Sequence, residues 1–169
     1  MEVSRYVVQM KRSAAAIRAL CDDPGLEPHW KPSHDRWSTV EILCHLADEE
    51  REDFRLRLDL TLHHPEQEWP PIDPAGWVTQ RDYAAKDPQE ALDDFLAERT
   101  RSIDWLGSLL SPDWSLFRTH PKAGKLSAGD LFAAWVTHDL LHLRQILRLQ
   151  HEWNETTSKP YRTLYAGEW

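Results

Sequence analysis

Two histidines placed four residues apart are the feature of this chain that most clearly suggests chemistry. His138 and His142 lie in the last long stretch without proline, Leu126 to Leu149. Residues four apart on an α-helix lie one above the other on the same face, so both imidazoles can point at one spot. A third histidine, His45, lies in an earlier stretch of the same kind, with Glu49 four residues later. Three convergent imidazoles with an open coordination position can hold a catalytic transition metal, which predicts a metal site.

Each of these histidines also has a simpler explanation. The chain has nine histidines, and a single H-x-x-x-H pair among them is weak support for a metal. A core histidine bonded to a carboxylate or a carbonyl is the default, and His45 with its acidic neighbours is equally compatible with a solvated helix face. The metal hypothesis gains from the fact that the three lie on two helices that must pack together. Imidazole ligands suit zinc, nickel, iron or copper and do not discriminate among them.

The prolines divide the chain into the elements that must position these histidines. They leave four long windows free of proline, and each window carries apolar residues at steps of three and four. Helix-starting patterns open three of them, at Ser38–Glu41, Asp87–Pro88 and Ser127–Asp130. No stretch alternates with period two. The sequence therefore predicts helices over about 2–21, 38–63, 88–110 and 127–151, in a single all-α domain spanning 1–169.

The long connection between the second and third predicted helices sets the topology. Four helices of this length form a bundle, and the segment 63–87 is long enough to run its whole length at about 3.3 Å per residue. The two helices can then be parallel and joined by a crossover. Because the segment is rich in proline and tryptophan, we expect an ordered strap across the bundle.

The composition excludes several classes of partner. The formal charge of -8 argues against binding to nucleic acid or an anionic membrane, which needs a basic face. No window approaches the roughly 18 apolar residues of a membrane span, and no secretory signal is visible at the start. Cys21 and Cys44 lie outside any C-x-x-C spacing. We expect a cytoplasmic protein with two reduced thiols and a small-molecule substrate.

Two segments resemble the paired motifs of one family. The run HPKAGKLSAGDLFAAWVTHDLLHLRQI (120–146) resembles the closing pattern of the DinB/YfiT-like superfamily, H-D-x-x-H-x-x-Q-I on the last bundle helix. The run RWSTVEILCHLADEERE (36–52) resembles its partner on the second helix, W-S-x-x-E-x-x-x-H-L-x-D. With the strap and the arginine-rich third helix, the resemblance extends over nearly the whole chain.

The resemblance implies a fold, a metal and a class of reaction. The fold is a four-helix bundle with a crossover between helices two and three, often dimeric. The metal is divalent, commonly nickel or zinc, held here by His45, His138 and His142. Members of known activity are mostly transferases or isomerases that use a low-molecular-weight thiol such as bacillithiol or mycothiol. We therefore expect a metal-dependent S-transferase that joins such a thiol to an electrophilic small molecule.

Five further side chains are expected to serve this site. They lie near the histidines along the chain or in the strap: Asp48, Glu49, Gln145, Trp135 and Trp77. Either carboxylate would accept a hydrogen bond from an imidazole or act as a general base. The glutamine would be a hydrogen-bonding wall, and the two indoles would shape the substrate pocket.

Three other functions stay open on the sequence. The first is a hydrolase that uses the same three ligands. The second is a non-catalytic bundle that stores or senses a metal or a small ligand. The third is a structural protein whose histidines are satisfied core residues.

Overall fold

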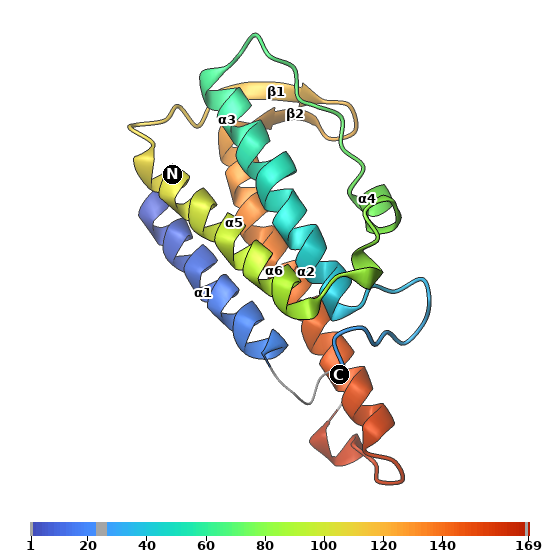
Figure 1. Cartoon of the computed structure of the whole chain (residues 1–169). Helices are drawn as coiled ribbons and strands as arrows, with labels where there is room; N and C mark the ends of the chain where they lie inside the picture. Colours follow the sequence, from blue (N-terminus) through green and yellow to red (C-terminus); the bar gives the residue numbers. More distant parts are fainter. Residues whose placement is uncertain (1, 23–26, 168) are drawn as a thin grey trace.

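The predicted bundle is present as four long helical rods. A computed structural model describes residues 2–22, 27–167 and 169. Three rods are single helices, and the second is two helices joined by a π-helical turn (Figure 1). Their bounds are α1 Val3–Cys21, α2 Thr39–Asp48, the π turn Glu49–Phe54, α3 Arg55–His63, α5 Pro88–Ser108 and α6 Ala128–Thr157. The all-α four-helix fold is confirmed, although the third rod ends two residues earlier than predicted and the last continues six residues further.

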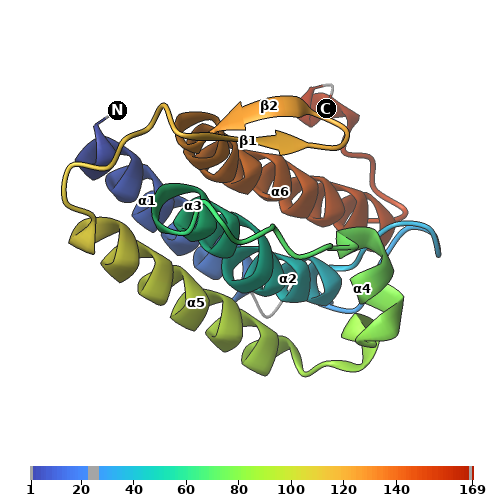
Figure 2. The ribbon, with the colours of Figure 1, turned by 90° about the horizontal axis from the view of Figure 1, so that it is seen from above.

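The second and third rods run in the same direction, as the crossover requires. Arg51 bonds to Asp94 and Arg55 bonds to Glu98, and both pairs are 43 residues apart in the sequence. A constant separation along two helices means that they are parallel. The strap between them carries the short helix α4 (Pro74–Gln80) and a 3-10 turn, Tyr83–Ala85. Figures 1 and 2 place α4 on the side of the bundle opposite α1, where it packs against α2.

The helix starts follow the predicted capping chemistry. The Ser38 hydroxyl accepts from the Glu41 backbone N–H while the Glu41 carboxylate accepts from the Ser38 N–H, which is a complete capping box. Ser127 and Asp130 form the same arrangement at the start of α6. Asp87 caps α5 by accepting two backbone N–H groups. These caps satisfy donors that a helix leaves free, so they fix the first residue of three rods.

The π turn in the second rod was not predicted, because a continuous helix was expected from 38 to 63. The turn has the sequence EEREDF, in which five of six residues are charged. Apolar spacing cannot distinguish an i+4 from an i+5 repeat in such a stretch. The wider turn sends successive side chains to different partners, Glu50 to Arg99 in the core and Arg51 to Asp94 on α5. Such turns are frequent at functional sites.

A short antiparallel hairpin corrects the expectation that the chain has no strands. Strands β1 (Phe117–His120) and β2 (Gly124–Ser127) have four residues each, too few for alternation to be visible in the sequence. Gly124 takes a positive φ of 74° where β2 begins. The backbone N–H of Ala128 donates to the carbonyl of Leu116 at 2.7 Å. The hairpin therefore anchors the first turn of α6, the helix that carries two of the histidines.

No helix among the described residues is long and apolar enough to cross a membrane.

Candidate metal centre

The structure brings the three predicted histidines together. His45 comes from α2, and His138 and His142 come from successive turns of α6. One nitrogen from each ring can be chosen so that all three lie within 4.8 Å of one another. The ring centroids are 4.4 Å apart for His138 and His142 and 4.8 Å apart for His45 and His142. Two separate rods thus converge on one point, as the metal hypothesis requires.

The nitrogen positions fit a small cation. The Nε2 atoms of His138 and His142 face each other at 3.1 Å. A tetrahedral zinc site with Zn–N bonds of about 2.1 Å separates its nitrogens by about 3.4 Å, so the spacing is close to what a metal requires. The Nδ1 atom of His45 is buried and has no hydrogen-bond partner in the part of the chain that the structure describes. An unpartnered buried nitrogen is costly, and a metal would remove that cost.

Burial keeps these rings neutral, which is the form that binds a metal. His45 and His142 are only 5% and 7% exposed, while His138 is half-buried. Burial, followed by the charges of the other two histidines, lowers the pKa of His45 to about 3. Burial, followed by His142 and Arg99, lowers the pKa of His138 to about 3. Burial also lowers the pKa of His142. His138 is the most exposed of the three rings.

The metal-free protein is expected to lose stability as the pH falls from about 6.5 toward 3. The ordinary histidine pKa is 6.5, whereas the folded values for His45 and His138 are about 3, so the unfolded chain binds more protons between these limits. The stability from the neutral rings is complete above pH 6.5 and disappears through this window. Urea unfolding midpoints of metal-free protein, taken at several pH values, measure how steeply stability changes with pH. A His138→Gln variant should show a weaker dependence on pH. Equal slopes would contradict the assignment.

Gln145 orients one of the ligands. The Nδ1–H of His142 donates to Gln145 Oε1 at 3.0 Å, since an amide oxygen can only accept. The other ring nitrogen, Nε2, then carries the lone pair and points at the shared centre. Hydrogen bonds of this kind fix the tautomer and direction of a ligand histidine. The predicted neighbour of His142 is therefore in contact with it.

Removing the acceptor is expected to weaken metal binding without removing a ligand. A Gln145→Ala variant should bind the metal about 10–100-fold more weakly, because the His142 ring loses its fixed tautomer. A Gln145→Glu variant keeps an oxygen at this place and should bind within a few-fold of the native protein. Competition with a chromophoric chelator gives both affinities. Equal weakening in the two variants would show that packing, not the hydrogen bond, matters.

Two aromatic side chains that sequence reasoning did not place at the site form its walls. The Trp37 ring lies 4.9 Å from the His45 ring and stacks parallel to that of His142 at 6.5 Å, measured between centroids. Phe54, in the π turn, lies 5.1 Å from His138. Neither contact follows from spacing, because both depend on how the rods meet.

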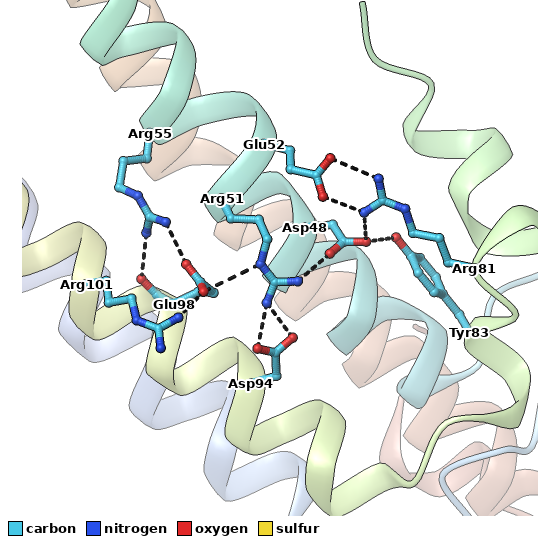
Figure 3. A network of polar contacts seen from close by, with 9 residues as sticks. All are labelled: Asp48, Arg51, Glu52, Arg55, Arg81, Tyr83, Asp94, Glu98 and Arg101. Carbon is cyan, nitrogen blue, oxygen red and sulfur yellow. Dashed lines mark hydrogen bonds and ion pairs between the residues drawn. The ribbon is translucent and has the colours of Figure 1, made fainter. Parts of the chain in front are cut away.

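Asp48 does not contact the histidines, which corrects its predicted role beside them. Its carboxylate accepts from Arg51 at 2.7 Å, from Arg81 at 2.6 Å and from the Tyr83 hydroxyl (Figure 3). Arg81 also binds Glu52 through both its terminal nitrogens. Arg81 and Tyr83 belong to the strap and its 3-10 turn, so Asp48 fastens the strap to the second rod. The hydrogen bonds that its carboxylate accepts come from Arg51 and from the strap, so its role here is structural.

Trp135 is a core residue and not the predicted pocket wall. It is 1% exposed, and its ring stacks on Phe54 with centroids 5.8 Å apart. Its indole N–H donates to Glu50 at 2.7 Å. The Trp77 side chain is likewise buried, 6% exposed, with the Arg81 guanidinium 4.3 Å from its ring centroid. Neither indole therefore lines an open pocket beside the histidines.

A buried ion cluster lies directly behind the metal centre. Arg99 on α5 bonds to both oxygens of Asp139 at 2.6 Å and to Glu50 at 2.6 Å. All three side chains are 2% exposed or less. Asp139 follows His138 in the sequence, so this cluster fixes the turn of α6 that presents the ligands.

Glu49 lies one turn beyond His45 and is paired with a second carboxyl group, Asp53. Glu49 is 5% exposed, and one of its oxygens has no hydrogen-bond partner. Burial, followed by the charge of Asp53, raises the pKa of Glu49 to about 8. Burial also raises the pKa of Asp53, against the opposing charge of Arg57. At neutral pH Glu49 therefore keeps a proton that it donates to the Asp53 carboxylate.

Comparisons with known proteins agree with this architecture. A sequence model of the DinB superfamily matches residues 9–146, which include all three histidines. The structure of YfiT from Bacillus subtilis is similar, with a TM-score of 0.76 and 17% sequence identity over 89% of this chain and 87% of that chain. YfiT is described as a probable metal-dependent hydrolase with an unusual four-helix bundle topology. No curated protein matches this sequence.

Proposed function

This chain belongs to the DinB superfamily, and from that premise we propose that it is a divalent-metal-dependent enzyme whose ligands are His45, His138 and His142. The observation that carries the proposal is the convergence of three neutral imidazoles, two of them buried, and one with a nitrogen that has no partner among the described residues. Nickel and zinc both suit an all-imidazole donor set. When bound, the metal would supply a Lewis acid that lowers the pKa of a nucleophile beside it.

The reaction we propose is transfer of a low-molecular-weight thiol to an electrophilic small molecule. His138, the most exposed ligand, marks the side from which both substrates would enter. Trp37 and Phe54 enclose the centre with apolar surface and exclude water there. The Asp53 carboxylate would accept the proton that the nucleophile gives up, and protonated Glu49 would supply the proton that the product needs. This role assigns Glu49, and not Asp48, as the acid–base residue.

Hydrolysis is the second candidate, and two observations favour it. The structural neighbour YfiT is described as a probable metal-dependent hydrolase. In addition, Glu49 and Asp53 form a carboxyl pair that shares a proton, and water attack needs a base at the start and an acid at the end. One pair of this kind can do both.

The two reactions separate in a single set of assays. We expect metal-loaded protein to accelerate conjugation of 1-chloro-2,4-dinitrobenzene with bacillithiol, mycothiol or glutathione, and His142→Ala to abolish the acceleration. Turnover of an ester or amide panel without added thiol would instead favour the hydrolase. Tight, stoichiometric metal with no turnover in either panel would point to a binding bundle and would contradict the enzyme proposal.

A further inference from the structure

A second cavity, distinct from the histidine centre, lies where the strap crosses the hairpin. Its volume is about 860 Å³. One wall is the second rod at Asp53 and Arg57, another is the strap at 68–72 and 74, and the third is the hairpin at 118–122. Three segments far apart in the sequence therefore enclose it. We refer to it as the strap cavity.

The strap cavity is connected to the metal centre through the π turn. Asp53 is in its wall, and the next residue, Phe54, packs on the ring of His138 with centroids 5.1 Å apart. Asp53 also shares the proton of Glu49, one turn beyond His45. A molecule in the cavity would thus lie beside Asp53 of the acid–base pair, on the same π turn that carries Phe54.

The cavity wall has hydrogen-bond donors that lack acceptors. Arg57 is 8% exposed; its Nε lies 3.0 Å from Asp53 in an ion pair and its Nη2 donates to the Pro70 carbonyl, so among the described residues its Nη1 is the nitrogen without an acceptor. The indole nitrogen of Trp69 is buried and unpartnered as well. His120 Nδ1 accepts two backbone N–H groups, so the neutral ring carries its proton on Nε2, a third donor. Buried donors are normally satisfied, so this wall calls for a molecule rich in acceptors.

The charges point to the same class of molecule. The lining carries three cations, Arg57, Arg118 and Lys122, against the carboxylates of Asp53 and Glu68, which gives a net charge of +1 in a chain of -8. The Arg118 guanidinium donates hydrogen bonds to the backbone carbonyls of Leu60, His64 and Gln67. Among the described residues, no carboxylate forms an ion pair with Arg118 or Lys122. Their positive charge therefore remains available to an anion.

The remaining wall is apolar and flat. The Arg57 guanidinium lies 5.0 Å from the centroid of the Trp69 ring, and the His120 ring lies 6.3 Å away on the same indole. Prolines and an isoleucine of the strap complete this surface. It is suited to an apolar body attached to an acidic group.

We propose that the strap cavity binds a carboxylate with an apolar body and that this molecule is the substrate of the metal site. Arg57, Trp69 and His120 donate to the carboxylate, and the indole of Trp69 holds the apolar part. The identification as substrate rests on the proposed function, whereas the binding of a carboxylate does not.

A matched pair of probes tests the charge requirement. Metal-free protein is titrated calorimetrically with 4-phenylbutyrate and with its neutral amide, and the Trp69 indole N–H is followed by NMR. We expect the carboxylate to bind at least about tenfold more tightly than the amide, because hydrogen bonds to a charged group are the stronger ones. Equal affinities, or an unshifted Trp69 resonance, would overturn the proposal.

Variants separate the cavity from the rest of the surface. Arg57→Gln should reduce carboxylate affinity to that of the amide, and Trp69→Phe, which keeps a ring without the N–H, should cost several-fold for the carboxylate alone. Lys125→Gln is the control, since the Lys125 ammonium lies over the Phe117 ring outside the cavity. Native affinity in both Arg57→Gln and Trp69→Phe would refute the site.

A variant of a metal ligand tests carboxylate binding independently of metal binding. A His142→Ala variant should lose the metal but keep its affinity for 4-phenylbutyrate within about twofold. Carboxylate binding by a protein that takes up no metal would support the cavity and defeat the proposed function. Metal binding without carboxylate binding would support the proposed function and overturn the assignment of the cavity.

Discussion

Purified His142→Ala protein is expected to contain almost no metal, while native protein contains about one divalent ion per chain. His142 lies nearest to both other rings, and its Nε2 faces that of His138 at 3.1 Å. Loss of an outer hydrogen bond to a ligand already costs about 10–100-fold in affinity, so loss of the ligand itself should cost more than about 100-fold. Elemental analysis after dialysis measures the metal content.

A matched control distinguishes metal bound at this site from metal bound by other histidines of the chain. His29 is exposed, and His29→Ala should leave the metal content unchanged. The metal-free His142→Ala protein should still be folded, with the helical circular dichroism of the native bundle. Stoichiometric metal in a variant with all three ligands replaced by alanine would end the metal hypothesis and leave three satisfied core histidines.

Replacement of Arg99 by methionine is expected to cause the largest loss of stability in the chain. Arg99 is the cation between Glu50 and Asp139, and the change would leave two buried carboxylates without a counter-charge. Breaking a buried pair of this kind costs about 3–5 kcal/mol, which is a large share of a typical unfolding free energy. Denaturant unfolding monitored by circular dichroism gives the value.

Two further variants show that the cost comes from the buried charges. Arg101→Met removes an exposed arginine of the same helix, which pairs with Glu98 (Figure 3), and should change stability by less than about 1 kcal/mol. Adding Glu50→Gln and Asp139→Asn to Arg99→Met should restore most of the loss, because no unpaired charge then remains. A small effect of Arg99→Met alone would mean that water reaches the cluster.

The sequence by itself determined the features that local chemistry controls. Prolines and capping residues placed the four rods, since both act within a few residues of where they stand. The His138–His142 pair was predictable because the helical repeat sets that geometry inside one element. The length of the segment 63–87 allowed the parallel crossover that is observed.

Only the tertiary structure decided what depends on how the rods meet. Asp48 and Glu49 are neighbours in the sequence, yet one binds the strap and the other pairs with Asp53 beside the metal centre. Trp37, and not the predicted Trp135, lies against the histidines, because packing selects which indole touches a histidine and which fills the core. Distances between helices depend on side-chain packing, on a π turn and on a strap. None of these can be predicted from the periodicity of apolar residues in the sequence.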